Sequence, residues 1–190
     1  MPQPMPVELQ PHSQEWTRFA EIECVRLSDV LRTNLVAVHH IGSTAIPGIC
    51  AKPIVDLIPE VLNLSRLDDE RQQVCSLGYQ WWGEHGLTGR RYCTLDDRGT
   101  GKRRVQLHCF VRGDAHIERH LAFRDYLRAH PEIAGEYEAV KIRARALHPN
   151  DSSAYAEEKS TWVSTIELLA LEWTRSQASL HTNNPGRGDR

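Results

Sequence analysis

The chain has 190 residues, a length typical of one domain with a sizeable hydrophobic core. Its 23 Lys and Arg are balanced by 25 Asp and Glu, so a formal net charge of −2 gives no global basic field to attract nucleic acid or an anionic membrane. No apolar run reaches the roughly 18 residues of a membrane span, and the N-terminus lacks the basic and apolar regions of a signal peptide. We therefore expect a cytoplasmic protein that has neither a membrane nor nucleic acid as its partner.

Five cysteines are spread along the chain without a Cys-x-x-Cys pair, which predicts reduced thiols rather than a disulfide framework or a cysteine zinc site. The proline-rich residues 1–12 are expected to form an extended N-terminal arm, and the Ser-, Asn- and Gly-rich residues 176–190 a disordered tail. Residues 13–175 contain no internal repeat. We expect a single domain there, with a helical segment over residues 115–175.

Hydrophobic periodicity predicts a helix, two strands, a second helix and three further strands, in that order. These elements are expected at residues 14–32 (helix), 35–41 and 53–61 (strands), 67–77 (helix), and 79–82, 91–95 and 103–111 (strands). Ser13 is a candidate N-cap of the first helix. Three helices follow, and Pro131 and Asp151 occupy typical helix-start positions there. The predicted fold is α/β (α+β), a mixed β-sheet backed by helices with an α-helical C-terminal third.

Gly42, Ser43 and Thr44 follow the first predicted strand. A glycine at a strand end lets successive backbone N–H groups converge, and two hydroxyl groups stand beside them, which is the chemistry of an anion cradle. The same residue types also form ordinary turns. The segment is therefore a candidate phosphate-binding turn whose neighbours must decide between the two interpretations.

Asp56 lies in the second predicted strand, on the same face as Ile54, Ile58 and Glu60. A carboxylate among apolar neighbours requires a hydrogen bond, an opposite charge or a cation. Asp56 is thus a candidate Mg²⁺ ligand. The alternative is a structural ion pair, for which Lys52 is the nearest basic residue in the sequence.

His108 and Gln106 share the polar face of the strand predicted at residues 103–111. An imidazole there could ligate a metal ion or act as a general base near neutral pH. The alternative is that this face meets water, as one face of an antiparallel sheet often does. His39 and His40 are adjacent on a strand, so they point to opposite faces and are not expected to chelate one metal ion.

Four further basic residues are candidate phosphate contacts. Lys159 and Arg124 interrupt the apolar stripes of two predicted helices, and Arg90 and Arg91 follow Gly89 at the start of a strand as a pair of guanidinium groups. Each could reach water through its long aliphatic stem, which is the common behaviour of such side chains. The alternative is that their charges point toward the anion cradle.

The chain also carries a family resemblance. Two neighbouring runs resemble the signature of the GrpB family, an uncharacterised group placed in the nucleotidyltransferase superfamily: His40-Ile41-Gly42-Ser43-Thr44-Ala45-Ile46-Pro47-Gly48 and Ala51-Lys52-Pro53-Ile54-Val55-Asp56. Later blocks of the family are resembled in order by Gly83-Glu84, Gly89-Arg90-Arg91, Leu107-His108, the run 119–128, Tyr155 and Lys159. The resemblance covers about residues 12–170.

The resemblance implies that Gly42 and Ser43 hold the phosphates of a nucleotide and that Asp56 is the first metal carboxylate. The second carboxylate should stand two residues later, where this chain has Ile58. His108 or Glu84 would then supply further ligands for a divalent metal, either Mg²⁺ or Mn²⁺.

The expected function is to bind a nucleotide, or another phosphorylated small molecule, together with a divalent metal and to transfer a nucleotidyl group to an acceptor. In that hypothesis Asp56 and His108 are catalytic, and the phosphate contacts are Gly42, Ser43, Thr44, Lys52, Arg91, Arg124 and Lys159. Ile58 motivates an alternative, a binding module that lacks catalysis. A further alternative is a hydrolase that uses Asp56 and His108 with Zn²⁺ or Mn²⁺.

Overall fold

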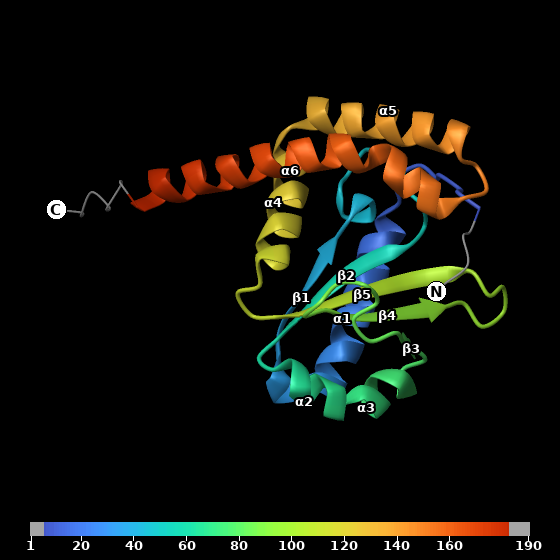
Figure 1. The fold of residues 1–190 in the computed structure, drawn as a ribbon, viewed down its shortest axis with the longest axis vertical. Coiled ribbons are helices and arrows are strands. Elements are labelled where there is room, and N and C mark those ends of the chain that lie inside the picture. Colours follow the sequence, from blue (N-terminus) through green and yellow to red (C-terminus); the bar gives the residue numbers. More distant parts are fainter. Residues whose placement is uncertain (1–5, 183–190) are drawn as a thin grey trace.

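A computed structural model describes residues 6–182, and its centre is a five-stranded mixed sheet in the order β1-β2-β5-β4-β3 (Figure 1). The strands are β1 (Leu35–Ile41), β2 (Val55–Val61), β3 (Gln80–Trp81), β4 (Arg91–Asp96) and β5 (Arg103–Val111). Strands β2 and β5 run parallel, and every other neighbouring pair is antiparallel. The predicted mixed sheet is confirmed, although β2 begins two positions later than the sequence pattern indicates, after Pro53.

Helices cover both faces of the sheet and one of its ends (Figure 1). They are α1 (Gln14–Leu31), α2 (Leu64–Asp69), α3 (Arg71–Ser76), α4 (Ala115–Ala129), α5 (Pro131–Leu147) and α6 (Ser152–Thr182). Helix α1 packs on one face, α4 contacts the opposite face, and α5 and α6 lie across the end of β1 and β2. The α-helical C-terminal third is confirmed. Within residues 6–182, no helix is both long enough and apolar enough to cross a membrane.

Alternation along β2 determines which side of the sheet is polar. Val55 and Leu57 are buried against α1 in the main core. Ile58 points the other way and packs with Ile41 and Phe110 beneath α4. Asp56 shares the face of Ile58, because strand residues two apart point to the same side. The helical third therefore lies over the polar face of the sheet.

Side-chain caps fix where the helices begin. Ser13 Oγ accepts a hydrogen bond from the N–H of Glu15, 3.2 Å away, at the start of α1. Asp151 Oδ1 accepts from the backbone of residues 153 and 154 at the start of α6. Pro131 is the first residue of α5. These three predicted start signals are confirmed, and each satisfies or avoids an unpaired N–H group in a first helical turn.

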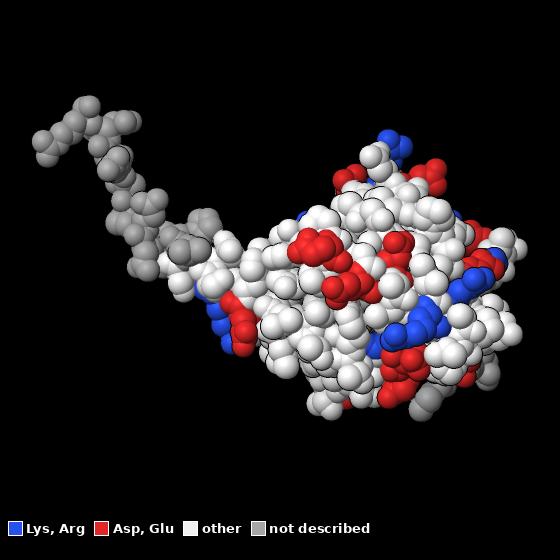
Figure 2. Space-filling view, turned by 90° about the horizontal axis from the view of Figure 1, so that it is seen from above, with Lys and Arg blue, Asp and Glu red and all other residues white. Residues whose placement is uncertain are grey.

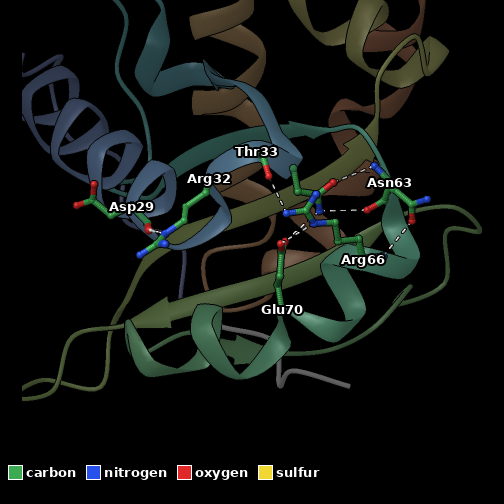
Figure 3. A network of polar contacts seen from close by, with 7 residues as sticks. Asp29, Arg32, Thr33, Asn63, Arg66 and Glu70 are labelled. Carbon is green, nitrogen blue, oxygen red and sulfur yellow. Dashed lines mark hydrogen bonds and ion pairs between the residues drawn. The ribbon is translucent and has the colours of Figure 1, made fainter.

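A polar network holds the sheet end that lies away from Gly42 (Figure 3). Asn34 is fully buried and donates to the carbonyl of Asn63 and to Glu70, while its own amide oxygen accepts from the N–H of Asn63. Arg66 connects Glu70 with the hydroxyl group of Thr33. The network ties the start of β1 to α2, so the opposite end of the strands is the end left for a binding site.

Two local predictions are wrong. The single helix predicted at residues 67–77 is two short helices, α2 and α3, separated at Glu70, whose side chain is held by Arg66 and Asn34. The disorder predicted from residue 176 does not extend to residues 176–182, because α6 continues through them. Each added helical residue gains a backbone hydrogen bond, so a docked helix can propagate into polar sequence. Residues 183–190 and 1–5 lie outside the described part of the chain, and the described part of the arm, residues 6–12, is non-helical.

Candidate functional site

The turn after β1 is shaped by Gly42, which has φ 71° and ψ −173°. Backbone in this region is adopted almost only by glycine. A Cβ atom at Gly42 would lie 2.5 Å from Oδ2 of Asp56, so a larger residue would collide with that carboxylate. Gly42 therefore permits the turn and allows the backbone to touch Asp56.

A cavity of about 170 Å³ adjoins this turn. The turn and the segment that enters β2 contribute Gly42, Ser43, Thr44, Lys52, Ile54 and Asp56. Gln106 on β5 belongs to the same sheet wall, and the opposite wall comes from α5 and α6, which contribute Tyr137, Tyr155 and Lys159. The cavity thus lies between the polar face of the sheet and the helical third, as expected if the helices cover a site.

Lys52 and Lys159 both line the cavity. Among the residues that the structure describes, neither lysine has a carboxylate within ion-pair distance. Lys159 Nζ lies 4.2 Å from the ring centre of Tyr155, and Lys52 Nζ lies 5.4 Å from it. Burial lowers the pKa of Lys159 to about 7, and repulsion from Lys52 and Lys141 acts in the same direction. Burial also lowers the pKa of Lys52. An anion in the cavity would relieve this repulsion.

Asp56 faces His108 across the parallel strands β2 and β5. His108 Nε2 lies 3.7 Å from Asp56 Oδ1, and the Asp56 side chain keeps 28% of its surface exposed, enough to contact a ligand. The expectation that both residues lie on one side of the sheet is confirmed.

Arg90 determines which nitrogen of His108 carries the proton. Arg90 Nη1 lies 3.4 Å from His108 Nδ1. Because a guanidinium group only donates hydrogen bonds, Nδ1 must accept, and the proton of a neutral His108 is on Nε2, facing Asp56. In this arrangement His108 supports the Asp56 carboxylate, and Nδ1 is not free to take a proton from a substrate.

The backbone of the turn is held from outside the cavity. Arg124 Nη1 donates to the carbonyl of His40 at 3.0 Å, and Arg128 Nε donates to the carbonyl of Ala45 at 2.8 Å. His40 Nε2 lies 2.9 Å from Thr44 Oγ1. Burial lowers the pKa of His40 to about 4, so this imidazole is neutral at pH 7. These contacts fix the two ends of the predicted cradle, and they give Arg124 a supporting position rather than one on the cavity wall.

Arg91 and Glu84 also lie outside the cavity. Arg91 is paired in register with Cys109, whose side chain is in the core beneath α1, so Arg91 points to the face opposite Asp56. There it makes two contacts with the carboxylate of Asp68, at 2.5 and 2.7 Å. Glu84 lies 3.6 Å from Arg91 Nη1 and accepts from the N–H of Gly89.

The structure brings most, but not all, of the predicted site residues together. Those on the cavity wall are Gly42, Ser43, Thr44, Lys52, Asp56 and Lys159. His108 stands beside Asp56, whereas Glu84, Arg91 and Arg124 have partners elsewhere. His39 and His40 bind different partners, Glu60 and Thr44, as expected for opposite faces of a strand.

The side chains near Asp56 suit a metal ion that is shared with a bound ligand better than one held by protein ligands alone. Within residues 6–182, no three His, Cys, Asp or Glu side chains come together as a metal site would require, so the set of Asp56, His108 and Glu84 is not formed. Ile58, at the position of the second expected carboxylate, is fully buried among apolar residues. Mg²⁺ is often held by one or two carboxylates together with substrate phosphates. Asp56 therefore fits a Mg²⁺ or Mn²⁺ ion shared with a ligand, and it does not fit a zinc site with three protein ligands.

Two residues of the site were not predicted, Tyr137 and Tyr155. Arg90 was a candidate phosphate contact together with Arg91, whereas the structure places it against His108. Ser43 Oγ donates to Tyr137 Oη at 3.2 Å, which joins the cradle to α5. Both tyrosines belong to apolar helical stripes, and that pattern does not distinguish a core position from a cavity wall. The spacing of Tyr155 and Lys159, four residues apart on one helix, was the available signal.

The arrangement of the sheet and the covering helices resembles that of a solved poly(U) polymerase, Cid1. Cid1, in the solved structure that holds its short product ApU, superposes with a TM-score of 0.51 and 12% identity over 79% of this chain and 48% of that chain. At this identity the likeness concerns the fold alone.

The family follows from closer similarity. Residues 6–168 match the family described as GrpB protein, and the chain belongs to that family. The solved structure of GrpB from Enterococcus faecalis has a TM-score of 0.82 and 34% identity, covering 88% of this chain and 99% of that one. The UPF0157 protein YqkA of Bacillus subtilis is 39% identical over 171 residues, which is 90% of this chain and 49% of that protein. This chain thus spans about half the length of that relative.

Proposed function

We propose that the cavity binds the phosphate groups of a nucleotide, or of another phosphorylated small molecule, and that with a nucleoside triphosphate the protein transfers the nucleotidyl group to an acceptor. One observation carries the proposal. The Gly42 turn, the Asp56 carboxylate and two lysines, Lys52 and Lys159, line the same cavity, and neither lysine forms an ion pair with a carboxylate of residues 6–182. Two such cations attract a polyanion, and one carboxylate provides for a cation that the polyanion brings with it.

Each residue would have a defined part in transfer. Lys52 and Lys159 would neutralise the phosphates, and the turn at Ser43 would orient them. An acceptor oxygen would attack the α-phosphorus, the bond from that phosphorus to its bridging oxygen would break, and pyrophosphate would leave with the electron pair. The acceptor proton would go to solvent, since Arg90 occupies Nδ1 of His108. A divalent ion bound at Asp56 would stabilise charge on the phosphate oxygens.

One observation favours a second candidate, a binding module without transfer. The cavity wall presents a single carboxylate, and Ile58 is packed in the apolar core beneath α4. Two-metal chemistry normally relies on several carboxylates. A module of this kind would bind the same ligands without releasing pyrophosphate. Hydrolysis by Asp56 and His108 is less favoured, because Nδ1 of His108 is held by Arg90.

Calorimetric titration with each nucleoside triphosphate, with and without Mg²⁺ or Mn²⁺, tests the proposal. We expect metal-dependent binding that weakens about tenfold or more in Asp56→Asn and in Lys159→Met. Arg91→Gln is the matched control, because it removes a cation from the other face of the sheet, and it should leave binding unchanged. An absence of binding in the parent protein would refute the proposal. Pyrophosphate release separates transfer from binding alone.

We also propose that this activity takes place in the cytosol. The structure shows all five cysteines as free thiols, which suits a reducing compartment. Fractionation of cells that produce the full-length protein, followed by immunodetection, tests this placement.

A further inference from the structure

A second cavity, of about 260 Å³, adjoins the first. The two cavities share Lys52 and Ile54 as wall residues, so Lys52 stands at their junction. The second cavity is bounded by the N-terminal arm, by the segment that leads into β2, by the loop before β5 and by the first residue of α6. It therefore continues the candidate phosphate site toward the outside of the protein.

The charges around the second cavity differ from those around the first. Glu8 and Lys102 lie on its wall and neutralise each other, with Lys102 Nζ 3.1 Å from both carboxylate oxygens. Arg103 is paired with Asp96, and only 7% of its side chain is exposed. Lys52, at the junction, also belongs to this wall, and it forms no ion pair with any residue that the structure describes. Pro53 and Ile54 supply apolar surface. This wall suits an uncharged group, whereas the first cavity suits an anion.

The sizes lead to the same conclusion. Small-molecule sites are ordinarily about 300 Å³ or larger. Neither cavity reaches that volume alone, at about 170 and 260 Å³, but the two together exceed it. A ligand large enough to fill a site of that ordinary size would therefore occupy both cavities.

We propose that the two cavities form one bipartite site, in which the smaller cavity holds the phosphate and the larger holds an uncharged ring or apolar group of the same molecule. Lys52 contacts the phosphate at the junction between them. The ligand is thus a phosphate ester with an uncharged organic part, rather than inorganic phosphate or an inorganic polyphosphate. This inference rests on the proposed function of the smaller cavity.

The arm completes the site as one of its walls. The N–H of Val7 donates to the carbonyl of Pro149 at 2.8 Å, and Gln10 forms a bridge with Ala51. Glu8 forms an ion pair with Lys102, which lies in the loop before β5. Because the arm is tied at these points, the larger cavity has a defined wall on its outer side.

Two probes with the same headgroup test the proposal, inorganic phosphate and phenyl phosphate, with affinities measured by nuclear magnetic resonance titration. We expect phenyl phosphate to bind at least tenfold more tightly. Ser152→Trp, which fills the larger cavity, should remove that gain and leave the affinity for inorganic phosphate unchanged. Ser153→Trp is the matched control, because the neighbouring residue is exposed and absent from the cavity wall, and the gain should persist.

A second measurement does not depend on any variant. Nuclear Overhauser contacts from the phenyl protons to the ring protons of Pro53 and the methyl groups of Ile54 are expected in the complex. Equal affinities for the two probes, or a gain that survives Ser152→Trp, would overturn the bipartite site while leaving phosphate binding intact. If neither probe binds, the proposed function fails, and this inference fails with it. If phenyl phosphate binds undiminished to Lys159→Met, the larger cavity is a separate site and the proposal is wrong.

Discussion

Single residues of the cavity carry charges that the fold does not neutralise. Lys159 lies over the ring of Tyr155, and an aromatic ring attracts a cation only weakly. The negative charge of Asp56 raises the pKa of Lys159 but only partly offsets the lowering caused by burial. By contrast, Lys141 on α5 donates to the carbonyl of Cys50 and is almost fully buried. Lys141 therefore has a structural partner, whereas Lys159 is available to a ligand.

The pKa of Lys159 predicts how anion binding depends on pH. At about 7 in the free protein, this pKa leaves the amine mostly neutral at pH 8. A bound polyphosphate favours the ammonium form, so the pKa rises and the complex takes up a proton. The affinity for a fully ionised triphosphate should therefore fall as the pH rises above 7. Calorimetry at pH 8, in buffers with different ionisation enthalpies, should report proton uptake that Lys159→Met abolishes. Equal uptake in this variant would contradict the assignment.

The same lysine is expected to lower stability. In the unfolded chain its pKa returns to the ordinary value of 10.5, so between pH 7 and that value the unfolded state binds more protons. The free energy of unfolding should therefore rise with pH over this window. At pH 7, Lys159→Met should stabilise the protein by roughly 1–3 kcal/mol, less than the full linkage value because the amine borders an open cavity. Urea denaturation of the parent protein and of Lys159→Met at pH 7 and pH 9 measures the rise of stability with pH and the gain from the substitution. A Lys159→Met variant that is less stable than the parent at pH 7 would contradict the prediction.

Arg90 is expected to act on Asp56 through His108. Replacing Arg90 with methionine removes the donor at Nδ1, so the proton should redistribute between the two ring nitrogens of His108. Arg90→Lys keeps a donor and serves as the control. Nitrogen-15 chemical shifts of the imidazole report the tautomer directly, whether or not the protein is active. A His108 that remains protonated on Nε2 in Arg90→Met would show that Arg90 does not position it.

At the scale of elements, the site is made by the end of one strand and the beginning of the next. β1 ends at Ile41, which is paired with Asp56 near the start of β2. The chain must turn between them while its backbone passes against the carboxylate. Gly42 meets both requirements, because it has a positive φ and no side chain.

Gly42→Ala should therefore be far more damaging than the same change at Gly48. Both glycines have positive φ, 71° and 81°, but a Cβ at Gly48 would meet no atom within 4 Å. The strain at Gly48 alone should cost about 1–2 kcal/mol. Gly42→Ala adds the collision with Asp56, so we expect a loss of about 3 kcal/mol or more, together with weaker nucleotide binding. Chemical denaturation of both variants measures the difference, and equal losses would contradict it.

The sequence predicts this part of the site well because its information is local. A period of two shows which residues share a face with Asp56 and with His108 within their own strands. The pairing of β2 with β5 then brings the two side chains to the same side of the sheet. The position of Arg90 is different, since the loop that carries it contains glycines with positive φ at 83, 86 and 89. Such a loop can direct either of two adjacent arginines toward the sheet, and no period selects one. The contact of Tyr137 is similar, because only helix packing determines that the hydroxyl group of this buried side chain meets Ser43.

At the scale of the whole molecule, a sheet layer and a helical layer meet at the cavity, and α6 runs along α5 before extending beyond it (Figure 1). Seen from above, the surface shows positive and negative side chains next to one another rather than a field of one sign (Figure 2). This distribution agrees with the nearly balanced composition. On this face, no field of one sign is present to attract an anion, so we expect recognition to depend on the cavity and on the placement of the two layers.

One contact between the layers is expected to control that placement. Glu138 on α5 accepts from the N–H of Cys50 at 2.6 Å, two residues before Lys52 at the cavity junction. Glu138→Ala would leave this N–H without its partner, so it should cost about 1–3 kcal/mol and weaken nucleotide binding through Lys52. Glu136→Ala, on the exposed side of the same helix, should change stability by less than about 0.5 kcal/mol. Urea denaturation and calorimetric titration of the two variants provide the comparison. If Glu138→Ala lowers stability without affecting binding, the position of Lys52 does not depend on this contact.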